Sequence, residues 1–153
     1  MSNVPAEDLE LCRRMRAMCA CNQLRRSARG MTQVFDAGMG PDGLKVTQMP
    51  VLVGLGVGGS MPVSALADAL GLDRTTLTRN LKVLEDRGLV LTAPHEQDAR
   101  VRMVSMTPEG ADELSAALAR WDRVQSLVEE RFGPERLRAL YDELDALSVA
   151  VGP

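Results

Sequence analysis

Residues 64–108 carry the strongest structural signal in the chain and read SALADALGLDRTTLTRNLKVLEDRGLVLTAPHEQDARVRMVSMTP. Two helical patterns occur here, and Gly71 and Gly88 stand where each should end, because glycine is favoured just past a helix C-terminus. The pattern predicts one helix over 65–70 and another over 74–87. Two short helices joined by a tight turn are typical of a helix-turn-helix.

The part that follows predicts a β-hairpin. Residues 89–93 and 101–106 have the composition of short strands, and the turn-forming run PHEQD at 94–98 separates them. A long helix should begin at 107–108, because Thr is a good N-cap and Pro is favoured at the first helical position. The hairpin would then form the wing of a winged helix-turn-helix. The candidate helix N-caps along the chain are Thr47, Ser64, Asp73 and Thr107.

Long apolar stripes flank the winged unit on both sides. Upstream, the pattern predicts one helix over 5–37 and a second over 48–57, separated by a Gly-rich loop. Downstream, the long helix should break at Gly133-Pro134 and be followed by a last helix that ends near Val151. The upstream stripe is Cys21, Leu24, Ala28, Met31 and Phe35, and the downstream stripe is Leu114, Leu118, Trp121, Val128 and Phe132.

These elements predict a mainly α fold with a small β-wing. We expect a single domain over 1–153, in which a winged helix-turn-helix at 44–106 lies between dimerisation helices at 5–37 and 108–151. The winged unit is too small to cover both apolar stripes. A second copy of the chain is the natural cover, so we expect a homodimer.

Composition limits the class of protein. Apolar residues make up 45% of the 153 residues, but no run approaches the roughly 18 apolar residues of a membrane span. Residues 1–10 lack a signal-peptide pattern, so we expect a cytoplasmic protein without membrane contact. The net charge is −3, but six arginines face three acids between 1 and 29, and the acidic surplus lies after 107. A DNA-facing surface in the middle of the chain is therefore permitted.

The helix predicted over 74–87 has the two faces that a DNA-reading helix needs. Leu81 and Leu84 each fall within about 40° of Leu77 at 100° per residue, which makes these three residues the buried face. Arg offers a fork that fits guanine in the major groove, and Thr offers a hydroxyl and a methyl group. The alternative is an ordinary solvated helix face. The candidate DNA-reading residues are Thr75, Thr76, Thr78, Arg79 and Lys82.

The wing carries two further cations, Arg100 and Arg102. Asp98 stands two residues before Arg100, so we expect its carboxylate to brace the guanidinium through a charge-assisted hydrogen bond. An arginine fixed at a wing tip suits a narrow minor groove. The alternative is an exposed ion pair of little energetic consequence.

Several of these motifs resemble those of MarR-family regulators. The stretches LADALG at 66–71 and DRTTLTR at 73–79 are similar to that family's reading head, and LEDRGLV at 84–90 to its helix-to-wing junction. The sequences DAR at 98–100 and MTPEG at 106–110 are similar to its wing signature, D-x-R followed by [LM]-T-x-x-G. Residues 44–52 resemble its second helix, and the resemblance covers about 10–150.

The resemblance implies a function. Members are dimers on double-stranded DNA whose first and last two helices interlock, so a pseudo-palindromic operator is expected. The matching Arg100 would enter the minor groove. Most members repress a nearby gene and release DNA when a small aromatic or anionic ligand binds, and others when a cysteine is oxidised. A protein of the same fold that has lost DNA binding, an anti-repressor, is the alternative that the acidic C-terminal part allows.

The cysteines Cys12, Cys19 and Cys21 leave three interpretations open. The residues around Arg29 resemble the first helix of organic-hydroperoxide sensors in the family, which puts Cys21 at their reactive position. The tyrosines that hold that cysteine are replaced, and Arg25 and Phe35 stand in their places. Cys21 is therefore a small apolar side chain, a redox switch, or a metal ligand. Metal is the least supported, because the chain's single histidine lies in the wing turn.

A ligand pocket is the other candidate trigger site. Met31, Phe35, Met49 and Leu52 have the apolar character that lines such a pocket, and they are equally suited to a plain core. No nucleophile elbow, metalloprotease, P-loop or dinucleotide-binding motif occurs, so the sequence predicts neither an enzyme nor a bound cofactor.

Overall fold

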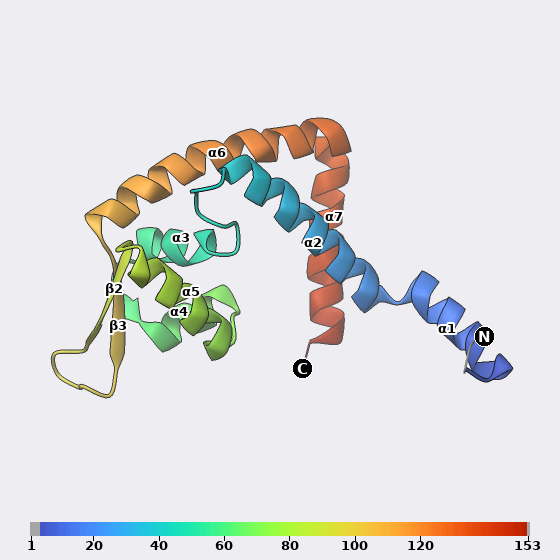
Figure 1. Cartoon of the computed structure of the whole chain (residues 1–153), viewed down its shortest axis with the longest axis horizontal. Helices are drawn as coiled ribbons and strands as arrows, with labels where there is room; N and C mark the ends of the chain where they lie inside the picture. Colours follow the sequence, from blue (N-terminus) through green and yellow to red (C-terminus); the bar gives the residue numbers. More distant parts are fainter. Residues whose placement is uncertain (1–3, 153) are drawn as a thin grey trace. The chain divides into compact units, whose positions relative to one another are not determined.

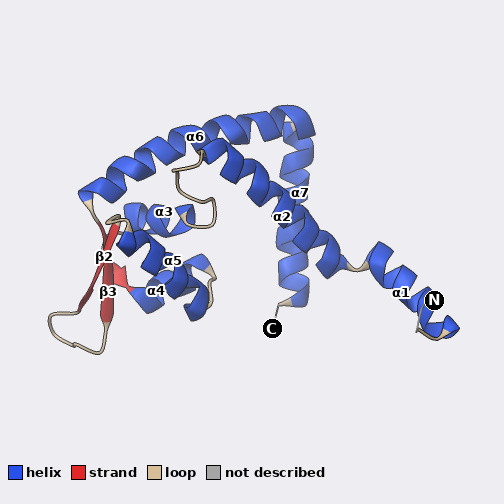
Figure 2. Ribbon diagram, in the orientation of Figure 1, coloured by secondary structure: helices blue, strands red, loops and turns tan. Residues whose placement is uncertain are grey.

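The computed structural model describes residues 4–152, so residues 1–3 and 153 of the predicted single domain lie outside the described residues. The chain divides into two compact units, 1–34 and 35–153. Strands are confined to one small sheet, and the rest of the ordered structure is helical (Figure 2). The described part contains no helix that combines the length and apolarity needed to cross a bilayer.

The elements follow the predicted order (Figure 1). The helices are α1 (Ala6–Met18), α2 (Ala20–Met39), α3 (Met49–Gly58), α4 (Val63–Leu70), α5 (Arg74–Asp86), α6 (Pro108–Phe132) and α7 (Pro134–Val151). The strands are β1 (Met61–Pro62), β2 (Val90–Pro94) and β3 (Arg102–Met106). The mainly α fold with a small β-wing is thereby confirmed.

The single helix predicted over 5–37 is wrong, because the chain breaks between α1 and α2. Cys19 has an extended backbone with φ −70° and ψ 110°, which ends α1. The side-chain amide of Gln23 donates a hydrogen bond to the carbonyl oxygen of Ala17 at 3.3 Å, so a carbonyl freed by the break keeps a partner. Neither glycine nor proline stands at the break, so helix propensity gives no signal there.

The caps around the helix-turn-helix agree with the sequence. Gly71 ends α4 with φ 60°, and the N–H of Leu72 donates to the carbonyl of Ala67 at 3.0 Å, which is a Schellman motif. The carboxylate of Asp73 accepts from the N–H of Thr76 at 2.9 Å and caps α5. Both ends of the turn between α4 and α5 are thus held by their own local hydrogen bonds.

Two predicted caps are wrong. α3 begins after Gln48 rather than Thr47, and the Gln48 side-chain oxygen accepts from the N–H of Lys45 at 3.1 Å instead of capping the helix. α4 begins at Val63 rather than after Ser64, because Pro62 pairs with β3 and leads straight into the helix.

The sheet has the order β1-β3-β2, with both pairs antiparallel. Its shortest strand is β1, whose Met61 pairs with Val104. β2 and β3 pair from Val90 with Met106 to Pro94 with Arg102. β2 lies one residue later than predicted, and β3 starts one residue later but ends at the predicted residue. They form the wing, which extends away from the first turn of α6 (Figure 1).

The helix-to-wing junction is fixed by Thr107. Its hydroxyl accepts from the N–H of Gly110 at 3.0 Å, which caps α6, and it donates to the carbonyl of Gly88 at 2.7 Å. The Thr107 N–H donates to the carbonyl of Leu89 at 3.1 Å. The start of α6 is therefore bonded to two of the residues that connect α5 to the wing.

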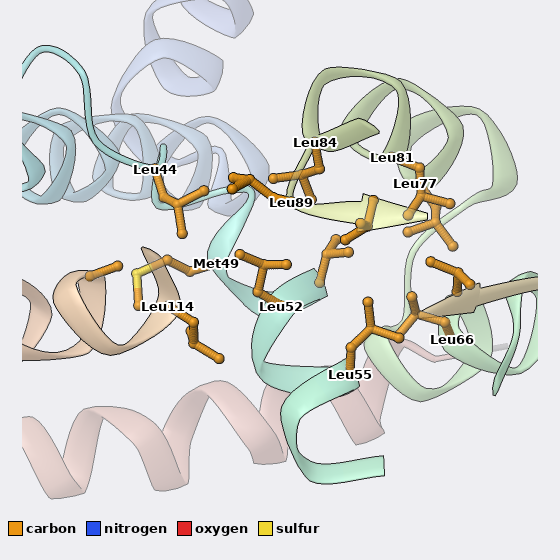
Figure 3. Packing of buried hydrophobic residues seen from close by; sticks show 14 of the residues in the cluster. Leu44, Met49, Leu52, Leu55, Leu66, Leu77, Leu81, Leu84, Leu89 and Leu114 are labelled. Carbon is orange, nitrogen blue, oxygen red and sulfur yellow. The ribbon is translucent and has the colours of Figure 1, made fainter. Parts of the chain in front are cut away.

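α3 lies at the centre of the core and packs on α4, α5, α6 and β3. Its Leu52 is 0% exposed and lies in the middle of the apolar cluster (Figure 3). The predicted buried face of α5 is confirmed, because Leu77, Leu81 and Leu84 all belong to this cluster. Packing of one face against α3 fixes which face of α5 points outward.

Candidate nucleic-acid interface

The outer face of α5 presents the predicted polar side chains to solvent. Thr75, Thr76, Thr78, Arg79 and Lys82 are all exposed. Arg79 makes neither a hydrogen bond nor an ion pair with the described residues, so its guanidinium is available to an external acceptor. The Arg79 fork is suited to reading a guanine edge.

Two of the threonine hydroxyls are already engaged. Thr76 donates to the carboxylate of Asp73 at 2.6 Å, and Thr78 donates to the carbonyl of Arg74 at 2.7 Å. A hydroxyl has a single O–H, so both now offer only lone pairs and a methyl group to a partner. Thr75 makes no such bond with the described residues, which leaves its O–H for donation.

The charges on this face are stable around neutral pH. The hydroxyl and N–H of Thr76 hold the pKa of Asp73 below its ordinary value, and the hydrogen bond from Lys82 to Asp86 at 2.7 Å raises the pKa of Lys82. The Asp73 contribution to stability is lost only as pH falls through the lowered pKa. The Lys82 contribution is lost only as pH rises through the raised pKa. Neither group changes charge near pH 7.

The wing tip is held differently from the prediction. Asp98 does not brace the Arg100 guanidinium, since its carboxylate accepts from the backbone N–H of Arg100 at 3.0 Å. The N–H of His95 donates to the carbonyl of Val101 at 2.8 Å and closes the hairpin. Asp98 therefore shapes the turn, because a carboxylate two residues upstream reaches the backbone more easily than a long exposed side chain. The Arg100 guanidinium makes no hydrogen bond or ion pair within residues 4–152.

Arg102 is engaged within the protein. Its guanidinium donates to the hydroxyl of Thr92 at 2.6 Å, and that hydroxyl in turn donates to the carboxylate of Glu85. Glu85 and Thr92 were not predicted as site residues, because only the folded arrangement brings the end of α5 beside the wing. No periodicity in the sequence signals the connection.

The predicted pocket residues have separate environments. Phe35, Met49 and Leu52 are buried, and the latter two belong to the core cluster, whereas Met31 is 41% exposed. A ligand pocket at these residues stays a prediction. The structure instead contains an open cleft of about 230 Å³ lined by the side chains of Arg16, Asn22, Gln23, Arg25, Arg26 and Arg29.

The three cysteines are free thiols on the first unit. Cys12 and Cys21 are exposed, and Cys19 is half-buried at the break between α1 and α2. Within the described residues, no cluster of His, Cys, Asp and Glu has the composition to hold a metal ion. A second open cleft, of about 370 Å³, lies at the wing and includes His95, Glu96 and Ser60 in its lining.

Comparison with known proteins relates this chain to transcription regulators. A MarR family model matches residues 42–101. The M. tuberculosis transcriptional regulator MosR, solved in complex with DNA, is 34% identical with a TM-score of 0.73, and the match covers 87% of this chain and 98% of that one. A probable transcriptional regulator from Pseudomonas aeruginosa is 28% identical with a TM-score of 0.76, over 84% and 96% of the two chains.

The fold extends to more distant proteins. The PcaV transcriptional regulator from Streptomyces coelicolor, solved with its natural ligand, shares 19% identity and a TM-score of 0.78 over 98% of this chain and 99% of that one. A search of curated protein sequences gives no significant match. Together with the family model, the identity to MosR over nearly its whole length shows that this chain belongs to the MarR family of DNA-binding transcription regulators.

Proposed function

We propose that the chain is a sequence-specific repressor that binds a pseudo-palindromic operator as a homodimer. In this proposal α5 enters the major groove, where Arg79 and Thr75 read base edges, and Arg100 of the wing enters the adjacent minor groove. The observation that carries the proposal is the pair of exposed, unpaired guanidiniums, one on α5 and one at the wing tip. In the same proposal, Lys82 and the methyl groups of Thr76 and Thr78 make additional contacts with the DNA beside those of Arg79 and Thr75.

The homodimer is supported by apolar surface that a single chain leaves open. Exposed apolar side chains on α6 and α7 are Leu118, Trp121, Leu127, Phe132, Leu140, Tyr141, Val149 and Val151. Large exposed apolar patches are rare on monomers, so the accumulation of such side chains on two successive helices favours a partner. The arginine surplus of residues 1–29 and the acidic surplus after 107 are complementary in charge, which favours a second copy as that partner.

We expect Leu140→Arg to convert the dimer to a monomer, because it places a charge among the exposed apolar side chains of α7. Light scattering during gel filtration measures the mass directly. The matched control is Val57→Arg on α3, where the native side chain is 88% exposed and lies outside α6 and α7. The control variant should remain dimeric. A Leu140→Arg protein that keeps the dimer mass would contradict the proposed interface.

We infer that the signal for DNA release acts on the first unit. This unit holds both the free cysteines and the arginine cleft, whose lining contains four guanidiniums and no carboxylate. A thiolate that attacks a hydroperoxide forms an S–O bond as the O–O bond breaks, which oxidises sulfur to a sulfenic acid and reduces the peroxide to an alcohol or water. An anionic aromatic ligand would instead be held by the guanidiniums.

The two triggers give different expected results. If cysteine oxidation is the trigger, cumene hydroperoxide releases the operator from the wild-type protein but not from a variant with Ser at positions 12, 19 and 21. If an anionic ligand is the trigger, benzoate at millimolar concentration releases the operator, and Arg25→Gln with Arg26→Gln removes the response. Fluorescence anisotropy of a labelled operator measures both. Release by neither compound, at concentrations that leave the protein folded, would contradict a trigger of these kinds on the first unit.

A further inference from the structure

Three side chains from three different elements form a directional hydrogen-bond relay. Arg102 on β3 donates to the hydroxyl of Thr92 on β2 at 2.6 Å, and Thr92 donates to the carboxylate of Glu85 on α5. Thr92 lies opposite Val104 in the ladder and Arg102 opposite Pro94, so the two side chains are diagonal neighbours. The relay therefore connects the reading helix to both strands of the wing.

The donors and acceptors of the relay are matched. Thr92 has one O–H, which it gives to Glu85, and it uses a lone pair to accept from Arg102. Both outer members are charged, and hydrogen bonds to charged groups are roughly twice as strong as neutral ones. Arg102 and Glu85 carry opposite charges on the two sides of this hydroxyl.

The relay includes residues that lie close in sequence to each of the two free guanidiniums of the interface. Glu85 follows Arg79 by six positions on α5, roughly 9 Å along the helix axis. Arg102 follows Arg100 by two positions, where the wing tip joins β3. A connection at this place controls how the wing is set against the helix, and so how far apart the two DNA-contacting cations are held.

We propose that Glu85, Thr92 and Arg102 are positioning residues for DNA recognition, and that Arg102 is not a phosphate contact. The relay holds the wing and α5 in the arrangement that lets Arg79 and Arg100 engage their two grooves together. A rigid arrangement in the free protein lowers the ordering that binding would otherwise require. This inference rests on the proposed operator binding.

The central test compares Thr92→Val, which keeps the shape and removes the hydroxyl, with Thr92→Ser, which keeps the hydroxyl. Anisotropy titrations use a DNA duplex from the region upstream of the protein's own gene, and a duplex of shuffled sequence, at several salt concentrations. Thr92→Val should lose about tenfold in operator affinity, with an unchanged salt slope, and should lose much less on the shuffled duplex. Thr92→Ser should bind like the wild type. Equal losses on both duplexes would overturn the proposal.

Arg102→Gln separates positioning from direct contact. A lost phosphate contact lowers the salt slope by about one, whereas a lost positioning residue leaves it unchanged. A double variant that combines Arg102→Gln with Thr92→Val should have the same operator affinity as the weaker-binding of the two single variants, because both changes break the same relay. A lowered slope for Arg102→Gln, or additive losses in the double variant, would overturn the assignment.

Amide hydrogen exchange tests the relay without DNA. Thr92→Val should speed exchange in β2 and β3 while leaving α3 and α6 protected, and Thr92→Ser should not. Unchanged exchange in the wing would overturn the relay whether or not the wild type binds an operator. Faster wing exchange in a protein whose wild type binds no operator would instead show that the relay exists and that the proposed function fails.

Discussion

Replacing both free guanidiniums, in Arg79→Ala with Arg100→Ala, is expected to abolish specific operator binding. Neither arginine makes a hydrogen bond or ion pair with the described residues, so its loss removes mainly contacts to an external partner. An arginine contact to DNA contributes about 1–3 kcal/mol, so losing both should weaken the operator affinity by at least about 30-fold. Anisotropy titration against the operator and a shuffled duplex measures the loss.

The same variant should keep its dimer mass and its melting temperature, because exposed side chains without partners contribute little to stability. The matched control is Arg131→Ala, which removes an arginine from the last turn of α6, at the end of that helix away from the wing (Figure 1). It should bind like the wild type. If the double variant binds the operator within about threefold of the wild type, the interface lies elsewhere on the chain.

Gly110→Ala is expected to destabilise the junction between α5, the wing and α6. A Cβ built on Gly110 would lie 2.1 Å from the carbonyl oxygen of Leu89 and 2.9 Å from Cγ of Met106. The first of these is a backbone atom that already accepts from the N–H of Thr107, so it cannot move away alone. We expect a loss of about 3 kcal/mol, or a melting temperature lower by roughly 10 °C.

The control for this prediction is Gly30→Ala in α2, where an added Cβ meets nothing within 4 Å. In a helix interior that change should raise stability by about 0.5–1 kcal/mol. Thermal unfolding of both variants at one protein concentration gives the comparison, since the stability of a dimer depends on concentration. Equal melting temperatures for Gly110→Ala and the wild type would show that the junction relaxes freely.

The winged unit is predictable from the sequence because its signals are local. Asp73 caps α5 through an N–H three residues ahead, and Gly71 ends α4 with a positive φ of 60°. The apolar spacing of Leu77, Leu81 and Leu84 fixes the inner face of α5, and hence the outer one. Each of these features depends on residues within about two turns of one helix, where spacing in the sequence determines which side chains lie close together.

The features that the sequence did not predict depend on distant partners. Ser64 is a good cap by type, but pairing of β1 with β3 starts α4 two residues earlier than predicted. The break at Cys19 occurs without a helix-breaking residue, and nothing in the local sequence explains it. The bonds of Arg102 to Thr92, and of Thr92 to Glu85, require the wing to lie beside the end of α5. Such contacts appear only after folding.

The central claim is that this chain recognises a specific duplex through α5 and the wing. The most direct test is anisotropy titration of the reduced wild-type protein with its own upstream duplex and a shuffled control at several salt concentrations. We predict a preference for the upstream duplex of about 1,000-fold or more, with an affinity that falls steeply as salt rises. Equal binding of the two duplexes across the salt series, or no binding at low salt, would contradict the account.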